Sequence, residues 1–261
     1  MADAAPTEIR KLFILLVGYE IIRKSGCIRG EQPHIVLAVP ICCYLMETAR
    51  GFVLYDTGLS SEGLDDPVAA RARYVNATFP LPPVVLPEHE LLPQLAKLGV
   101  APGDITEIVL SHAHGDHTGH LRDFRNARIT IQRQEYEAAM ADRGRVNFAD
   151  YSDPSITWNI VDGDMALMPG LDLVLTRGHQ PGHQSAVIRL ERDGVKILTG
   201  DVADLLENFE RELIGGAMDD PAALASIRRL NAIARETGGE LIPLHDPLFV
   251  QRARLAPDHY A

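Results

Sequence analysis

The segment from residue 111 to residue 117 holds a dense group of potential metal ligands. It reads Ser-His-Ala-His-Gly-Asp-His, so three imidazoles and one carboxylate fall within six residues. Neutral imidazole and carboxylate are ligands that borderline divalent cations such as zinc accept. A histidine-rich surface loop with incidental metal affinity is the alternative, but further ligand candidates later in the chain favour a metal site. The segment therefore predicts hydrolytic metal chemistry.

The spacing within this segment predicts that it serves two cations. His112 and His114 lie two residues apart at the end of an extended run, so their side chains point the same way and can share one cation. Asp116 and His117 lie beyond the turn, from which they can reach a second cation.

These ligands need strands that end beside one another. Residues 105–110 are apolar and partly β-branched, which predicts a buried strand that ends at the histidine segment. Donors at several strand ends assemble a site in three dimensions. Three more expected strands are followed by such residues: 171–176 by His179 and His183, 195–199 by Asp201, and 240–244 by His245.

The order of these residues resembles the metallo-β-lactamase superfamily. The pattern His-x-His-x-Asp-His is followed along the chain by Gly-His, then by Gly-Asp, then by a last histidine. Within the superfamily the chain most resembles the N-acyl homoserine lactone lactonases and related lactone hydrolases, over nearly all of its length. The resemblance implies an α+β fold, an αββα sandwich in which helices flank two mixed β-sheets.

The resemblance also implies a role for each side chain. Asp56, in an Asp-Thr-Gly turn, and His183 are implied to orient ligands rather than to bind metal. Asp116 is implied to pass a proton to the leaving alkoxide as well. The implied ligand sets are His112, His114 and His179 for one metal and Asp116, His117 and His245 for the other, with Asp201 bridging them.

Three positions depart from the lactonase pattern. Asp204 stands where those enzymes carry a tyrosine that contacts the lactone. A carboxyl group stabilises an oxyanion only when protonated, so either the pKa of Asp204 is raised beside the metals or another group stabilises the oxyanion. Gly115 replaces a bulky apolar residue, which predicts a differently shaped pocket. His120 also differs, and it is either a pocket residue or an exposed histidine.

The resemblance implies a dinuclear hydrolase in which a metal-bridging hydroxide opens a cyclic ester. Zinc is the expected metal, although manganese, cobalt or iron suit the same ligands. The substrate is expected to be an N-acyl homoserine lactone, as in quorum quenching, or a lactone intermediate of aromatic-compound catabolism. The same ligand set also suits a thioester hydrolase of the glyoxalase II type or a mononuclear iron persulfide dioxygenase. The C-terminal residues 255–261 lack the basic patch that glutathione-dependent glyoxalases use.

Composition narrows the possible partners. With 261 residues, 46% of them hydrophobic, the chain is expected to form one domain over 1–261, and a homodimer is possible. The formal net charge of −11, without a Lys/Arg cluster, argues against a nucleic-acid substrate. No stretch is long enough to span a membrane, and the apolar run 12–17 is too short for a signal peptide. Three cysteines without a disulfide pattern predict buried thiols in a reducing cytoplasm.

Apolar periodicity predicts the remaining elements. Helices are expected over 88–98, 133–143 and 220–238. The other strands are expected near 12–18, 35–47, 51–55, 128–132 and 186–191. Segments 59–86 and 141–166 are expected to be irregular, and long loops of this kind often contact substrate. Their aromatic residues are therefore candidate pocket walls, or else they anchor the loops to the core or form a dimer contact: Tyr74, Phe79, Phe148, Tyr151 and Trp158.

Overall fold

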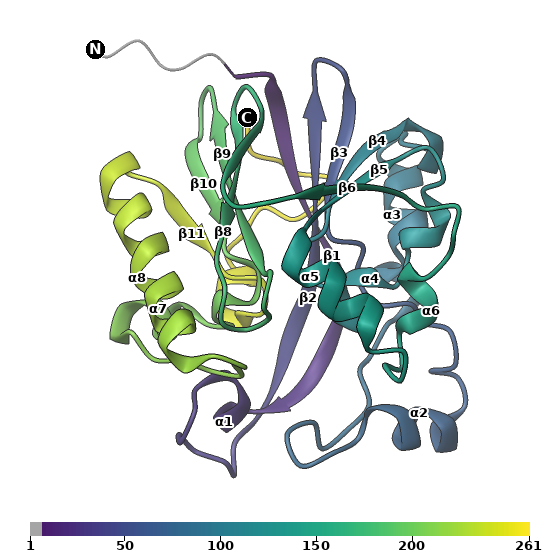
Figure 1. Cartoon of the computed structure of the whole chain (residues 1–261). Helices are drawn as coiled ribbons and strands as arrows, with labels where there is room; N and C mark the ends of the chain where they lie inside the picture. The colour runs from purple at the N-terminus through teal and green to yellow at the C-terminus, as the bar shows by residue number, and fades with distance from the viewer. Residues whose placement is uncertain (1–6) are drawn as a thin grey trace.

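The computed structural model describes residues 7–261, and it contains two β-sheets that pack face to face (Figure 1). The first sheet has six strands in the order β1 to β6, with antiparallel pairing from β1 to β3 and parallel pairing from β3 to β6. Its strands are β1 (Ile9–Arg23), β2 (Val36–Thr48), β3 (Gly51–Tyr55), β4 (Ile105–Val109), β5 (Arg128–Gln132) and β6 (Thr157–Val161).

The second sheet has five strands in the order β11-β10-β9-β8-β7. β10 and β11 pair in parallel and the other neighbours are antiparallel, so this sheet is mixed as well. Its strands are β7 (Met165–Met168), β8 (Leu171–Leu175), β9 (Gln184–Leu190), β10 (Gly194–Leu198) and β11 (Glu240–Ile242).

Helices cover the outer face of each sheet. In Figure 1, α7 and α8 lie outside the second sheet, while α3, α5 and α6 lie on the other side of the molecule, beside the first. This arrangement confirms the predicted αββα sandwich. The α-helices are α1 (Lys24–Cys27), α2 (Pro67–Tyr74), α3 (Leu91–Lys97), α4 (Gly115–Thr118), α5 (Arg133–Ala141), α6 (Phe148–Tyr151), α7 (Leu206–Arg211), α8 (Asp220–Thr237) and α9 (Pro247–Val250). Four 3-10 turns are Pro87–His89, Pro102–Asp104, Leu121–Asp123 and Gly200–Val202.

Apolar side chains fill three layers of this sandwich. Leu12 of β1, Tyr44 of β2 and Leu173 of β8 belong to the core between the sheets. Leu95 of α3 packs in the core beneath the first sheet, and Ile227 of α8 packs beneath the second. Since successive side chains of a strand face opposite ways, each strand of a sheet covered on both sides contributes to two of these layers.

The three cysteines are buried and unpaired, as predicted. Cys42 and Cys43 are neighbours on β2 and point into different layers: Cys42 into the core between the sheets and Cys43 into the core under α3.

The β1–β2 pair extends past the other strands as a two-stranded ribbon that ends at α1 (Figure 1). Beyond a register shift between Leu16 and Gly18, the pairing continues from Tyr19 opposite Pro40 to Arg23 opposite Val36. This ribbon carries polar residues of β1 toward the loops that hold the histidines.

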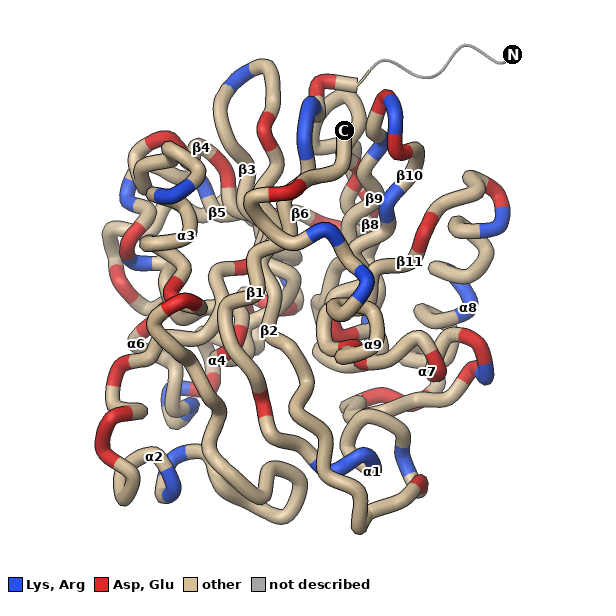
Figure 2. The backbone as a smooth tube through the Cα atoms, turned by 180° about the vertical axis from the view of Figure 1, so that it is seen from behind, with Lys and Arg blue, Asp and Glu red and all other residues tan. Residues whose placement is uncertain are grey.

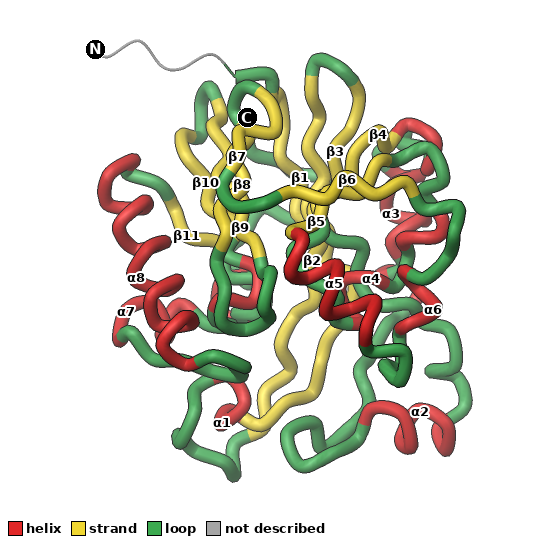
Figure 3. The backbone as a smooth tube through the Cα atoms, in the orientation of Figure 1, coloured by secondary structure: helices red, strands yellow, loops and turns green. Residues whose placement is uncertain are grey.

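Both segments expected to be irregular contain regular structure (Figure 3). Segment 59–86 contains α2, whose first turn is capped by the Asp66 carboxylate accepting from the backbone N–H groups of Val68 and Ala69. Segment 141–166 contains α6, β6 and the start of β7. The prediction was wrong because β6 is short and gains its hydrogen bonds from a distant strand, β5, which no local pattern records.

Helix and strand positions elsewhere agree closely with the prediction. The expected helix 88–98 is divided, since a 3-10 turn ends at His89 and α3 begins at Leu91. The expected helix 220–238 is α8, which begins after the Asp219 cap and ends at Gly238 with a φ of 63°.

Charged residues are mixed over the backbone. In the view of Figure 2, Lys and Arg positions are interspersed with Asp and Glu positions along the backbone. Across residues 7–261, none of the helices has both the length and the apolar composition needed to cross a membrane.

Candidate metal centre

Two groups of metal-ligand side chains lie at one edge of the sandwich. His112, His114, His179 and Asp201 form the first cluster, and Asp116, His117, Asp201 and His245 form the second. Within each cluster the potential ligand atoms all lie within 4.8 Å of one another. The structure therefore brings together all seven side chains that the sequence proposed as ligands.

Four loops deliver these side chains. His112 and His114 follow β4, and Asp116 and His117 lie in the one-turn helix α4. The other ligands follow β8, β10 and β11 as predicted, at segments that run along the same edge of the two sheets (Figure 3).

Asp201 faces both clusters with separate oxygen atoms. Its Oδ2 lies 3.4 Å from His179 Nε2 and 3.6 Å from His112 Nε2. Its Oδ1 lies 3.3 Å from His245 Nε2 and 3.4 Å from His117 Nε2. A carboxylate placed in this way can bridge two cations.

Two buried ligand atoms have no hydrogen-bond partner in the described part of the chain. They are His117 Nε2 and Asp201 Oδ1, and both point into the second cluster. An unpartnered buried polar atom costs free energy unless another group satisfies it. A divalent cation between these atoms would do so, and the imidazole and carboxylate donors suit zinc.

Hydrogen bonds on the far side of each ring fix which nitrogen faces the cluster. His117 Nδ1 lies 2.8 Å from Asp56 Oδ2, His245 Nδ1 lies 2.8 Å from the Pro40 carbonyl, and His179 Nδ1 lies 2.8 Å from the Gly216 carbonyl. In each case the outer nitrogen donates, which leaves the Nε2 lone pair for a cation.

His183 uses both of its ring nitrogens within the protein. Its Nδ1 lies 3.1 Å from the Thr176 carbonyl, and its Nε2 accepts from the backbone N–H of Asp201 at 2.9 Å. A Cβ at Gly200 would meet this Nε2 at 2.5 Å, so the close approach requires glycine there. These contacts support the predicted role of His183 in orienting Asp201 rather than binding metal.

Asp56 is fully buried and joins β3 to the histidine loop. Its carboxylate accepts from the backbone N–H and the hydroxyl of Ser111, both at 2.7 Å, and pairs with His117. Burial raises the pKa of Asp56, while His117 and Ser111 oppose that rise. The predicted orienting role of Asp56 agrees with these contacts.

The second cluster is arranged as ion pairs. Burial would lower the pKa of His245, but Asp201 and Asp116 raise it to about 10. Burial would also lower the pKa of His117, but Asp116 and Asp201 hold it well above its usual value. Burial would raise the pKa of Asp116, yet His117 holds it at about 2. In the second cluster, protonated imidazoles therefore balance the carboxylates.

The first cluster has the opposite character. Burial and the neighbouring histidine His117 keep the pKa of His112 well below its usual value. Burial and His179 lower the pKa of His114 to about 3. His112 and His114 are therefore neutral at pH 7, which is the state that binds a cation.

Glu135 is not among the predicted site residues, although it is fully buried beside the histidine loop. Its carboxylate accepts from the backbone N–H of Ala113 at 2.9 Å and from that of Gly182 at 3.2 Å. It thereby ties the loop after β4 to the loop after β8. Its place in the first turn of α5 is the one local signal, since a helix N-terminus favours an acidic residue.

Asp204 lies close to the second cluster and is only partly exposed. Burial raises its pKa, against the lowering effect of His245. This direction agrees with the condition set by the sequence, that a carboxyl here must hold its proton to stabilise an oxyanion. The Asp204 carboxylate also helps burial to raise the pKa of the Cys27 thiol, so this cysteine stays a neutral thiol.

The candidate pocket aromatics divide into two sets. Tyr74 and Phe79 line a cavity of about 160 Å³ together with Glu20 of β1. Tyr151 is 1% exposed and belongs to the core under the first sheet, and Phe148 packs against its ring at a centroid distance of 5.6 Å. Trp158 lies in β6, not in a loop, with its ring 5.3 Å from that of Tyr136.

Two further pocket candidates have other neighbours. A side chain at Gly115 would point toward Asn147, whose Cβ lies 3.5 Å from the ideal Cβ position. Asn147 donates to the Ala113 carbonyl, so segment 141–156 covers the histidine loop here. His120 pairs with Asp123 at 2.9 Å and lines a separate polar cavity with Glu62, away from the seven ligands. Of the two alternatives for His120, a pocket residue or an exposed histidine, neither is decided by these contacts, but none of the seven ligands lines the cavity beside it.

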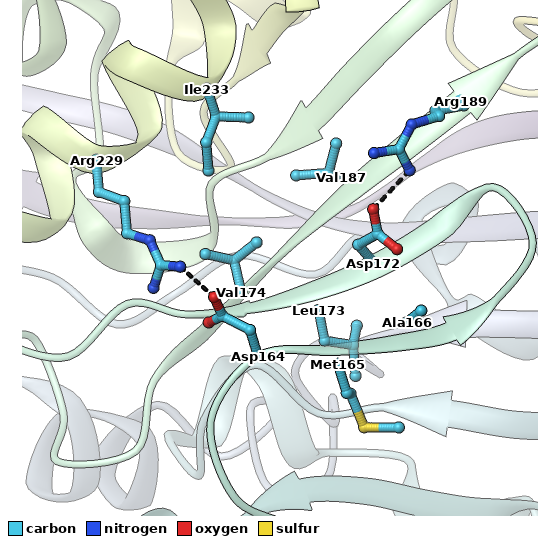
Figure 4. Close-up of a pocket in the computed structure, with 10 residues that line it drawn as sticks. All are labelled: Asp164, Met165, Ala166, Asp172, Leu173, Val174, Val187, Arg189, Arg229 and Ile233. Atoms are coloured by element: carbon cyan, nitrogen blue, oxygen red, sulfur yellow. Dashed lines mark hydrogen bonds and ion pairs between the residues drawn. The ribbon is translucent and has the colours of Figure 1, made fainter. Parts of the chain in front are cut away.

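A cavity of about 390 Å³ lies elsewhere, between β7, β8, β9 and α8 (Figure 4). Its charged residues pair with one another: Arg189 with Asp172 at 2.6 Å, and Arg229 with Asp164. Because none of the seven ligands lines it and its charges are satisfied, this cavity is not the candidate active site.

Comparison with known proteins agrees with this geometry. Residues 38–245 match the family described as the Metallo-beta-lactamase superfamily. The N-acyl homoserine lactonase AiiA of Bacillus thuringiensis subsp. kurstaki is 31% identical over 251 residues, which cover 96% of this chain and 99% of that protein. AttM of Azorhizobium caulinodans, also an N-acyl homoserine lactonase, is 30% identical over 85% of this chain and 88% of its own length.

Solved structures resemble the whole chain. An N-acyl homoserine lactone hydrolase, with the product N-hexanoyl-L-homoserine bound at its catalytic metal centre, superposes with a TM-score of 0.89 at 31% identity. The match covers 97% of this chain and 100% of that one. The dizinc lactonase AidC shares the fold, with a TM-score of 0.67 at 22% identity, and the match covers 94% of this chain and 92% of AidC. The chain belongs to the metallo-β-lactamase superfamily, as a metal-dependent hydrolase similar to the N-acyl homoserine lactonases.

Proposed function

We propose that this protein is a dinuclear metal-dependent lactonase, which adds water to a cyclic ester and releases the hydroxy acid. The position of Asp201 carries the proposal, because its two oxygens face two separate clusters of histidines. A site for one cation has no need of the second cluster, so this arrangement favours a dinuclear hydrolase over a mononuclear iron dioxygenase.

The ligand sets would be those that the sequence indicated, with one divalent cation in each cluster and Asp201 between them. The unpartnered buried atoms of His117 and Asp201 fit such occupation. Bound cations of this kind supply Lewis acidity and lower the pKa of a coordinated water. Zinc is the preferred metal for these ligands, with manganese, cobalt or iron as alternatives.

Two carboxyl groups of the chain would manage protons and charge. Asp116 presents Oδ2 to His117 and His245, at 3.1 and 3.5 Å, which leaves its other oxygen free. That oxygen would accept a proton from the water that attacks the carbonyl carbon and pass it to the ring oxygen as the ester bond breaks. Asp204, with its raised pKa, would donate a hydrogen bond to the ester oxygen that becomes negative.

A lactone is the proposed substrate class, since the relatives that cover most of this chain are named as N-acyl homoserine lactonases. Either an N-acyl homoserine lactone or a lactone from aromatic-compound breakdown fits the proposal. We also infer a cytoplasmic location from the unpaired cysteines, and a single domain from the length and composition of the chain. A homodimer stays a prediction.

Titration of released acid tests the proposal directly. The zinc-loaded protein would be assayed at constant pH against N-acyl homoserine lactones, aryl lactones and a glutathione thioester. We expect lactone turnover that falls at least about 100-fold in His112→Ala and Asp201→Asn but persists in the control His120→Ala. Turnover of thioesters alone, or one iron per chain with oxygen uptake, would contradict the proposal.

A further inference from the structure

Glu20 lies on the β1–β2 ribbon next to the second cluster. Its neighbour Tyr19 is paired with Pro40, whose carbonyl accepts the hydrogen bond from His245 Nδ1 at 2.8 Å. Glu20 itself is opposite Val39. The strand register therefore places Glu20 within one residue of the backbone that holds a proposed metal ligand.

The electrostatics of Glu20 agree with this position. Burial raises its pKa to about 8, with a further rise caused by Asp116 and a lowering caused by His245. Both of these residues belong to the second cluster, so the Glu20 carboxyl lies within the field of that cluster.

Glu20 also lines the cavity of about 160 Å³. The walls beside it are mainly apolar, and they include Phe79, Leu81 and Pro83. Tyr74 of α2, which lines the same cavity, also lies in the field of Asp116. The cavity therefore adjoins the proposed site of lactone hydrolysis and has room for a small substituent.

The carboxylate of Glu20 has no hydrogen bond or ion pair with any residue that the structure describes. Arg73 lines the cavity too, but its guanidinium stacks over the Tyr74 ring at 5.1 Å and donates to the Val146 carbonyl at 3.4 Å. Asn76 is also engaged, since its Oδ1 accepts from the backbone N–H groups of Thr78 and Phe79.

An alkyl chain in this cavity would remove water from Glu20 and leave its carboxyl group without a hydrogen-bond partner, which is costly. A bound group that donates hydrogen bonds and carries positive charge would instead satisfy it, and its charge would lower the pKa of Glu20 from about 8, so that the carboxyl ionises on binding. We propose that Glu20 makes this enzyme prefer lactones with an ammonium group on or beside the ring over lactones with an alkyl chain there. This inference rests on the proposed lactone hydrolysis.

The test compares three lactones with one ring. L-homoserine lactone, assayed at a pH where its amine is protonated, carries the ammonium group; γ-butyrolactone lacks any substituent; N-hexanoyl homoserine lactone carries an alkyl chain. We expect the zinc-loaded wild type to show the highest kcat/KM on L-homoserine lactone. The ratio of its kcat/KM to that of γ-butyrolactone should fall about 10- to 100-fold in Glu20→Gln, since hydrogen bonds to charged groups have such effects.

Two controls separate a substrate contact from a general effect. Glu62→Gln, at a side chain that is 83% exposed, should keep the wild-type ratio. Calorimetry should show that L-homoserine, the ring-opened product, binds more weakly to Glu20→Gln, while 4-hydroxybutyrate does not discriminate between the proteins.

A wild type that opens N-hexanoyl homoserine lactone faster than L-homoserine lactone would overturn the inference, as would an unchanged ratio in Glu20→Gln. In both cases lactone hydrolysis itself would stand. If the zinc-loaded wild type opened none of the three lactones, the proposed function would fail instead.

Discussion

The backbone N–H of Asp201 donates a 2.9 Å hydrogen bond to Nε2 of His183, a fully buried histidine outside both ligand clusters. The other ring nitrogen, Nδ1, donates to the carbonyl of Thr176 at the end of β8. The bridging position of Asp201 thus depends on a ring held by the loop that carries His179.

His183→Ala should weaken metal binding without unfolding the protein. Removal of the ring frees the Asp201 backbone, and loss of such an orienting partner typically costs about 10- to 100-fold in metal affinity. Metal content after dialysis against a graded chelator, measured by mass spectrometry, checks this. His120→Ala is the control, because the ring of His120 is also paired to a polar group but belongs to neither ligand cluster. Equal metal retention in both variants would contradict the role assigned to His183.

Asp56→Asn should impair the second cluster selectively. An amide nitrogen opposite His117 Nδ1 sets two donors against each other, which moves the His117 proton to Nε2 and removes the lone pair that faces the cluster. The backbone should tolerate the change, since Asp56 has a φ of 60° and asparagine accepts that region readily. We expect the metal content to fall from two ions toward one ion per chain.

The control for Asp56→Asn is Asp123→Asn, which alters an Asp–His pair away from the clusters. It should keep both ions. If Asp56→Asn still bound two metal ions with unchanged affinity, the Asp56 carboxylate would not set the tautomer of His117.

Glu135→Gln should lower stability. The buried carboxylate accepts from the N–H groups of Ala113 and Gly182, and a glutamine offers one acceptor in place of two. An unsatisfied buried N–H costs about 1–3 kcal/mol. In a chain of this size we expect a Tm decrease of roughly 2–4 °C for each kcal/mol. Thermal unfolding of Glu137→Gln, an exposed position on the same helix α5, is the comparison, and a similar Tm in both variants would argue against the tie between the loops.

The ligand positions could be predicted in part from local pattern, since apolar segments indicate the strands that end before His112, His179 and His245. The complete ligand set came from the resemblance to the metallo-β-lactamase superfamily. Strand ends in one sandwich meet at the same edge, so the ligands converge without any long-range information. The position of Glu20 could not be predicted in this way, because locally it only interrupts an apolar run. Its proximity to His245 follows from the pairing of Tyr19 with Pro40, whose carbonyl accepts the hydrogen bond from His245. The strand that holds Trp158 was missed for a related reason, since β6 depends on its pairing with β5.

The two clusters should differ in how their metal binding depends on pH. In the metal-free protein the pKa of His245 is about 10 and that of His117 is well above 6.5, so both rings hold protons at pH 7. A cation must displace these protons, and binding at the second cluster should therefore strengthen as pH rises toward about 10. At the first cluster, His112 and His114 are already neutral, so these two ligands should add little pH dependence to binding between roughly pH 6 and 8.

The same shifts predict how the metal-free protein responds to pH. The raised pKa of His245 means that its ion pair with Asp201 stabilises the fold fully below the usual pKa of 6.5, and that this stabilisation is lost as pH rises through about 10.

The difference in metal binding between the two clusters can be measured by calorimetry. Titration of the metal-free protein with zinc, in buffers of different ionisation enthalpy, counts the protons released in each binding step. We expect the step at the first cluster to release fewer protons than the step at the second. Two steps that release equal numbers of protons would show that the carboxylates of the second cluster do not hold its histidines in the protonated form.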